Sequence, residues 1–189
     1  MTPSAVLDLF RQSGALLEGH FKLSSGLHSS GYLQSALVLQ HPEHAEALGR
    51  ALADRLRPLS PTVVLSPALG GLIIGHEVGR GLGVRAMFAE RQDRVMALRR
   101  GFALAPQDAV VVVEDVVTTG KSTRETIAVV EGTGARVVAA AALIDRSGGQ
   151  AGLDVPLHVL ASLALPTYAP TECPLCTAGT PVVKPGSRG

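Results

Sequence analysis

The chain has 189 residues, of which 46% are hydrophobic and 17% are charged, and this balance excludes a disordered protein. The formal net charge is only +1, so the overall charge favours neither a nucleic acid nor a membrane surface as partner. The sequence has no apolar run of 18 residues and no basic N-terminal stretch followed by an apolar one. We therefore expect no membrane span, no export signal and a cytoplasmic location.

The first elements of the chain are weakly defined. Residues 2–14 predict a short amphipathic helix, because Thr2-Pro3 precedes an apolar pattern that ends at Gly14. Residues 16–39 combine turn residues with weak strand signals. A second helix is predicted over 42–57, where apolar residues recur on one stripe.

From residue 62 onward, strands and helices alternate. The predicted strands are 62–66, 86–90, 109–114, 137–144 and 157–163, and the predicted helices are 71–82 and 122–132. Ser122 and Glu125 fit a capping box at the start of the second of these helices. Alternation of this kind predicts an α/β fold with an open, mainly parallel twisted sheet and helices on both faces.

We expect a single domain over 1–189. It divides into an N-terminal segment (1–40), an α/β core (41–165) and a C-terminal tail (166–189).

The most informative stretch is residues 110–123. Four valines predict a strand buried on both faces, and Glu114 and Asp115 follow them. The next residues, Thr118 to Ser122, are small and rich in hydroxyl groups, and such a turn at a helix start can direct backbone N–H groups at an anion. Acids beside an anion site predict a ligand with both a polyol and a phosphate, such as a sugar phosphate.

A nucleotide-binding P-loop is the alternative for this stretch, since Gly120-Lys121-Ser122 resembles its end. The P-loop pattern requires glycine at the position of Asp115. A carboxylate there would crowd and repel the phosphates, so the sequence argues against this alternative.

Polar or glycine-rich segments also follow the other predicted strands. They are residues 66–71, 91–100 and 145–149. In open α/β sheets, ligands bind outside the carboxyl ends of the strands. We therefore expect these segments and residues 114–122 to form one composite active site.

The stretch around Glu114 and Asp115 resembles the phosphoribosyl pyrophosphate (PRPP) signature of the type I phosphoribosyltransferases. The resemblance implies that these two acids hold the ribose hydroxyls. It also implies that the following loop binds the 5′-phosphate through Thr118, Thr119, Gly120, Lys121 and Ser122, and that Val116 and Val117 belong to the PRPP-binding stretch. Ala68, Leu69 and Gly70 correspond to the loop that binds pyrophosphate.

The same resemblance assigns residues 88–102 to a mobile cover. Arg91 in this cover is expected to reach pyrophosphate, in the family usually at the neighbouring subunit's site, so a homodimer is expected. Arg91 and Asp115 are the expected catalytic residues. Mg²⁺ is the expected cofactor, held mainly by PRPP and not by protein side chains.

Three segments narrow the resemblance to the orotate phosphoribosyltransferases. They are residues 19–26, the run Asp145-Arg146-Ser147-Gly148-Gly149, and the C-terminal residues from Cys173 to Arg188. The match implies a small N-terminal hood region that covers the substrate, and transfer of the phosphoribosyl group to orotate in the synthesis of UMP. The implied orotate-binding residues are Thr118, Arg146, Phe21, Ser25 and Gly26. An arginine can grip the carboxylate of orotate through two hydrogen bonds.

Two other functions stay open at this point. A purine phosphoribosyltransferase would use the same PRPP residues, but a purine has no carboxylate for Arg146. A regulator that binds PRPP without turnover could keep the fold and lose the chemistry.

The two cysteines, Cys173 and Cys176, form a C-x-x-C pair in a proline-rich tail. One pair is a weak zinc signal, because structural sites need four ligands. A reduced pair in a structured loop, a metal shared across a dimer and a disulfide all stay open. The six histidines are interpreted as structural or surface residues.

Overall fold

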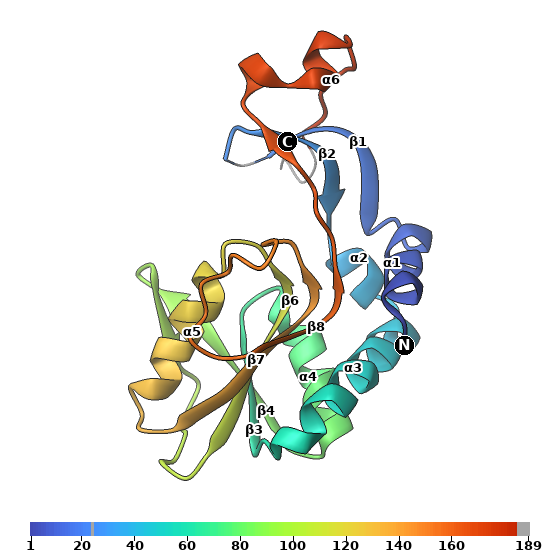
Figure 1. Ribbon diagram of the computed structural model, residues 1–189. Coiled ribbons are helices and arrows are strands. Elements are labelled where there is room, and N and C mark those ends of the chain that lie inside the picture. The colour runs from blue at the N-terminus through green and yellow to red at the C-terminus, as the bar shows by residue number, and fades with distance from the viewer. Residues whose placement is uncertain (24, 185–189) are drawn as a thin grey trace.

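The computed structural model describes residues 1–23 and 25–184, and within these it forms two sheets (Figure 1). The main sheet has six strands in the order β5-β4-β3-β6-β7-β8. Every neighbouring pair in it is parallel except β4 with β5. The strands are β3 (Val63–Pro67), β4 (Arg85–Gln92), β5 (Val95–Leu98), β6 (Ala109–Val117), β7 (Arg136–Asp145) and β8 (Leu157–Ser162). The predicted mainly parallel sheet is confirmed.

Helices cover both faces of this sheet, as predicted (Figure 1). Helices α1 (Pro3–Gln12), α3 (Pro42–Leu56) and α4 (Gly71–Leu82) pack in the larger apolar core, and α5 (Lys121–Glu131) packs in the other. The valines of β6 alternate between the two cores: Val111 and Val113 join the first, and Val110 and Val112 join the second. All four are fully buried, as a strand in the middle of a parallel sheet requires.

A smaller antiparallel sheet stands apart from the main one, in the order β1-β2-β9. It consists of β1 (Leu16–Lys22), β2 (His28–Leu33) and β9 (Thr167–Tyr168). The chain after β9 passes through η2 (Pro170–Glu172) and α6 (Pro174–Thr177) and then lies beside β1, where Phe21 bridges to Val183. We call residues 16–33 and 167–184 the hood, except Ser24, which lies outside the described residues. The weak strand signals of the N-terminal segment thus correspond to real strands, and the tail adds the third.

Two short helices connect the parts, α2 (Ala36–Leu39) and η1 (Arg57–Leu59). Among the described residues, no helix has the length and apolarity needed to cross a bilayer. The terminal residues 185–189, which contributed to the sequence resemblance, lie outside the described residues.

Two local predictions are wrong. Strand β6 continues to Val117 and not only to residue 114. Glu114 and Asp115 therefore lie within the strand, and its backbone pairing fixes their positions. Helix α5 has Gly120 as its N-cap, with φ of 71° and no side-chain cap hydrogen bond. Because Ser122 already lies inside the helix, it cannot cap the helix as the capping box required.

Candidate active site

The parallel register brings the carboxyl ends of β3, β4, β6 and β7 to one edge of the main sheet. The loops after β3 and β6 touch each other there. A Cβ atom added to Gly70 would lie 2.6 Å from Oδ1 of Asp115, so only glycine fits against this carboxylate. In the same loop the Ala68–Leu69 peptide is cis, and Leu69 is largely exposed. The structure therefore joins the predicted pyrophosphate loop to the predicted ribose-binding acids.

The two acids are partly withdrawn from solvent. Burial raises the pKa of Glu114 to about 7, and the neighbouring charge of Asp115 adds to the rise. The hydroxyl of Thr123 donates a hydrogen bond to Glu114, and this bond lowers the pKa and so limits the rise. Burial also raises the pKa of Asp115. A hydrogen bond from the backbone N–H of Val116 favours the ionised form and limits this rise. Hydrogen-bond donors supplied by a ligand, such as vicinal hydroxyls, would stabilise both carboxylates in their charged form.

The turn between β6 and α5 leaves Thr118 and Thr119 exposed at the start of an 11-residue helix. The guanidinium of Arg124 fixes this turn from behind by donating to the carbonyl oxygens of Thr119 (3.0 Å) and Ala151. With Gly120 in the left-handed conformation, the turn ends directly at the helix N-terminus. The positive end of the helix dipole and its free N–H groups make this a suitable place for a phosphate.

A cavity of about 620 Å³ lies between this edge and the hood. Its lining comes from the hood, from the turn after β6, from the loop after β7 and from the segment between β8 and β9. The lining residues are Leu23, Ser25, Leu27, Tyr32, Thr118, Thr119, Arg146, Ser147, Gln150, Leu165 and Thr167. Three of the five residues predicted to bind orotate, Ser25, Thr118 and Arg146, are therefore brought together.

Arg146 is the cation of this cavity. Its Nε atom is buried and has no hydrogen-bond partner among the described residues, and burial lowers the pKa of its guanidinium. The backbone holds it in place, because its N–H donates to the carbonyl oxygen of Val117 at 2.8 Å. A buried donor without a partner is costly, so this position favours an anionic ligand.

Comparisons with known proteins identify the family. The family described as phosphoribosyl transferase domain matches residues 35–156. An orotate phosphoribosyltransferase of Heliobacterium modesticaldum is 54% identical over the full length of both chains. The chain belongs to the orotate phosphoribosyltransferases, within the phosphoribosyltransferase family.

Solved structures show the same fold. The orotate phosphoribosyltransferase of Aeropyrum pernix is 28% identical, with a TM-score of 0.67 over 84% of this chain and 93% of that one. The enzyme of Mycobacterium tuberculosis in complex with PRPP is 22% identical, with a TM-score of 0.67 over 85% and 96% of the chains.

Two residues implied by the orotate phosphoribosyltransferase resemblance, Phe21 and Gly26, do not line the cavity. Phe21 is buried and packs against Tyr32 with ring centroids 6.1 Å apart, and it is Tyr32 that lines the cavity. Tyr32, Leu165 and Thr167 were missed because they come from two segments far apart in sequence, which meet where β2 pairs with β9 and where Leu165 lies against Gly31 of β2. The only local signal was the strand-like run around Tyr32.

Arg91 lies near the end of β4 and does not line the cavity. Its guanidinium pairs with Glu125 of α5 and donates to the carbonyl oxygen of Arg94 at 3.1 Å. In the same cover, Arg100 pairs with Glu90 at 3.0 Å. The structure does not bring Arg91 to the cavity of its own chain, so its catalytic role in this family member stays a prediction.

Proposed function

We propose that the protein transfers the 5-phosphoribosyl group of PRPP to orotate, giving orotidine 5′-monophosphate and pyrophosphate in the synthesis of UMP. The observation that supports this most directly is the unpaired, buried Nε of Arg146 in a cavity that also includes Thr118 and Thr119. A guanidinium whose Nε has no partner among the described residues suits the carboxylate of orotate, and adenine has no carboxylate. The relative from Mycobacterium tuberculosis is described in complex with PRPP, which supports PRPP as the donor.

The residues at the edge have separate tasks in this reaction. Glu114 and Asp115 accept hydrogen bonds from the ribose hydroxyls, and residues 118–122 donate to the 5′-phosphate. Of residues 68–70, the backbone N–H groups of Leu69 and Gly70 donate to the pyrophosphate, because the N–H of Ala68 already donates to the carbonyl oxygen of Ala89 at 2.8 Å. As the bond from C1 of the ribose to pyrophosphate breaks, pyrophosphate leaves with the bonding electrons, and a ring nitrogen of orotate forms the new bond to C1 and gives up its proton to the departing pyrophosphate or to water. Holding both reactants in line supplies much of the rate enhancement.

We further propose Mg²⁺ as the cofactor. PRPP is expected to hold the ion mainly through its own oxygens, and the carboxylates of Glu114 and Asp115 lie at the same edge of the sheet, where they would attract a divalent cation. When bound with PRPP, the ion neutralises charge on the leaving pyrophosphate. Activity should disappear with EDTA and return with excess Mg²⁺, and full activity in EDTA would exclude this part of the proposal.

A homodimer in the cytoplasm completes the proposal, with Arg91 acting at the partner's site. Mixing the variants Arg91→Gln and Asp115→Asn, each of low activity, tests this directly, because a mixed dimer contains one site with neither substitution. Recovery of about a quarter to a half of wild-type activity is expected. No recovery in a sample that has exchanged subunits would exclude action across the interface.

The deciding experiment follows the loss of orotate absorbance in the presence of PRPP and Mg²⁺, with adenine as the alternative acceptor in a parallel assay. Turnover with orotate and not with adenine is expected. Turnover with adenine alone would indicate a purine enzyme. Binding of PRPP, measured calorimetrically, without turnover of either base would indicate a regulator.

A further inference from the structure

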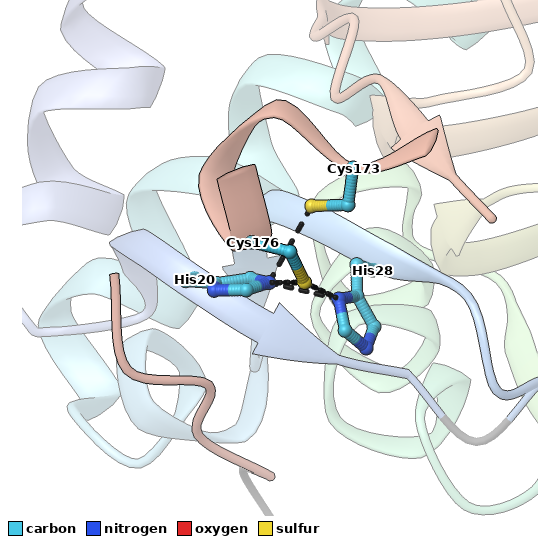
Figure 2. Close-up of side chains that lie close together, drawn as sticks. All are labelled: His20, His28, Cys173 and Cys176. Carbon is cyan, nitrogen blue, oxygen red and sulfur yellow. Dashed lines mark hydrogen bonds between the residues drawn. The ribbon is translucent and has the colours of Figure 1, made fainter. Parts of the chain in front are cut away.

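Four side chains of metal-ligand type meet at the outer end of the hood, away from the main sheet. His20 lies on β1, His28 begins β2, and Cys173 and Cys176 lie at the start of α6 and within it. Figure 2 shows their ring nitrogens and sulfurs directed toward one another. One ligand atom from each residue lies within 4.8 Å of the other three. Three segments that are distant in the sequence thus deliver two imidazoles and two thiols to one point.

The distances match a tetrahedral metal site. With zinc–sulfur bonds of about 2.3 Å and zinc–nitrogen bonds of about 2.0 Å, a sulfur and a nitrogen ligand lie about 3.5 Å apart. Nε2 of His20 lies 3.5 Å from Sγ of Cys173 and 3.7 Å from Sγ of Cys176. Nδ1 of His28 lies 3.3 Å from Sγ of Cys176. The two ring nitrogens are 2.8 Å apart, and a small rotation of either ring gives the wider spacing that a shared ion needs.

A neighbouring carbonyl prepares His20 for this role. Nδ1 of His20 lies 2.7 Å from the carbonyl oxygen of Thr180, and because a carbonyl can only accept, Nδ1 must hold the proton. The lone pair is therefore on Nε2, the atom that faces the cysteines. Metal-bound histidines are commonly oriented by this kind of hydrogen bond from the other ring nitrogen.

The burial of the cluster also favours a metal over a set of hydrogen bonds. His20, His28 and Cys173 are only 3%, 6% and 1% exposed, and both cysteines are free thiols. Without a metal, His28 can donate one hydrogen bond to His20, but the thiols then contribute only weak hydrogen bonds. An ion uses all four groups at once, and it does so where the hood offers few apolar side chains for a core.

The irregularity of β1 serves the same arrangement. The pairing of β1 with β2 slips between Glu18 and Phe21, so one extra residue is accommodated in β1. A bulge of this kind changes the direction of a side chain, and here His20 and the next residue, Phe21, are both buried. A regular strand would direct these two neighbours to opposite faces.

We propose that His20, His28, Cys173 and Cys176 form a structural zinc site that fastens the C-terminal tail to the hood. Two nitrogen and two sulfur ligands in tetrahedral arrangement are typical of zinc. The segment between the two histidines includes Leu23, Ser25 and Leu27, which line the cavity, so the metal holds this part of the substrate cover in place. The site is distinct from the Mg²⁺ proposed at the sheet edge, and it does not depend on the function proposed above.

Metal content is the first test. The full chain, purified without an affinity tag or chelator and reconstituted with Zn²⁺, should contain one zinc per chain by elemental mass spectrometry. Cys176→Ser is the most informative variant, because Cys176 is exposed and its loss disturbs packing least. Its affinity for zinc should fall at least about 100-fold. The matched control is His41→Asn, because His41 and His44 also form a close pair, with ring centroids 5.1 Å apart, and it should keep the zinc.

Hydrogen exchange gives a second, independent measurement. Removing the metal with a chelator should increase exchange in residues 16–33 and 167–184, and leave β3 and β6 of the main sheet unchanged. Co²⁺ in place of zinc should give the visible bands of a tetrahedral site together with thiolate charge-transfer absorption, and Cys176→Ser should lose both. Wild-type protein that takes up no stoichiometric zinc, that binds iron in its place, or that keeps its zinc in Cys176→Ser would overturn the proposal.

Discussion

The main sheet and the hood face each other across the same cavity, but they are held together in different ways. In the main sheet, Val110 to Val113 are fully buried between two layers of helices, so apolar packing fixes the positions of Glu114 and Asp115 that follow. In the hood, three short strands have a polar cluster at their outer end, where His20, His28 and Cys173 are buried. The residues proposed to bind PRPP thus lie on the part fixed by apolar packing, whereas the hood depends for its order on specific polar contacts.

The largest effect is expected from Arg146, on the rigid side of the cavity. Arg146→Gln removes the charge that we propose faces the orotate carboxylate, and truncating one partner of a buried charge pair costs several kcal/mol. We expect kcat/KM for orotate to fall about 100- to 1,000-fold. On the hood side, Ser25→Ala removes at most a neutral hydrogen bond and should lower kcat/KM less than about tenfold.

Steady-state kinetics with varied orotate measures this difference, and Arg136→Gln is the matched control. Arg136 is exposed at the opposite end of the same strand, β7, so its replacement should leave kcat/KM unchanged. If Ser25→Ala were as damaging as Arg146→Gln, the hood would contribute directly to catalysis and the comparison would fail.

The free energy of unfolding should also be more sensitive to substitutions in the main sheet than to substitutions in the hood. Leu143 is fully buried in β7, and Leu143→Ala should lower the free energy of unfolding by about 2–5 kcal/mol. Leu17 of β1 is 37% exposed, so Leu17→Ala should lower it by less than about 1 kcal/mol. Denaturant unfolding of both variants, with metal present, gives the comparison. Equal losses of unfolding free energy would mean that apolar packing stabilises the hood as much as it stabilises the main sheet.

The sequence predicted the main sheet well because its signals are local. A run of valines, a glycine-rich turn and an alternating order of strands and helices each depend on neighbouring residues, and helix α4 begins and ends at the predicted residues, 71 and 82. The acids Glu114 and Asp115 and the exposed turn before α5 also come from one short stretch of sequence. The end of β6 and the cap of α5 were misjudged, since the pairing of Val116 with Ile144 extends the strand past two charged residues.

The hood was not predictable to the same degree because its contacts join the two ends of the chain. Strand β9 has only two residues, Thr167 and Tyr168, and no periodicity can be read from so short a segment. The C-x-x-C pair looked incomplete because its partners, His20 and His28, lie about 150 residues earlier. A histidine in a strand carries no signal of its own until the fold brings it to the cysteines.

A smaller effect is expected from the pH dependence of Glu114. Its pKa is raised from 4.5 to about 7 in the folded protein. Below pH 4.5 the group is protonated in both the folded and the unfolded state, so it contributes no difference. As the pH rises to 7, only the unfolded state ionises readily, and the free energy of unfolding should fall by at most about 3 kcal/mol.

Thermal unfolding across pH 4.5 to 8 tests this for the ligand-free protein. Glu114→Gln should be as stable as the wild type at the acidic end and more stable at pH 8, because it cannot lose a proton. Glu43→Gln, at an exposed position of α3, should follow the wild type throughout. A wild-type curve parallel to that of Glu114→Gln would show that Glu114 ionises normally and that the edge is more open to water than the structure indicates.

The smallest effect is expected at the hairpin of β4 and β5, a part of the main sheet that packs more like the hood. Its turn, Asp93-Arg94, has positive φ at both residues, and Arg91 is tied to α5 by the pair with Glu125, in which both side chains are partly exposed. Partly exposed ion pairs contribute little, so Glu125→Gln should lower the free energy of unfolding by less than about 1 kcal/mol and by even less at high salt.

Hydrogen exchange should nevertheless rise in residues 91–98, because the hairpin is released from helix α5. Glu46→Gln, which also removes a surface pair with arginines, is the control and should leave that hairpin unchanged. A loss of stability as large as that of Leu143→Ala would place the hairpin with the rigid core, and it would then be a poor candidate for a cover that moves to admit PRPP.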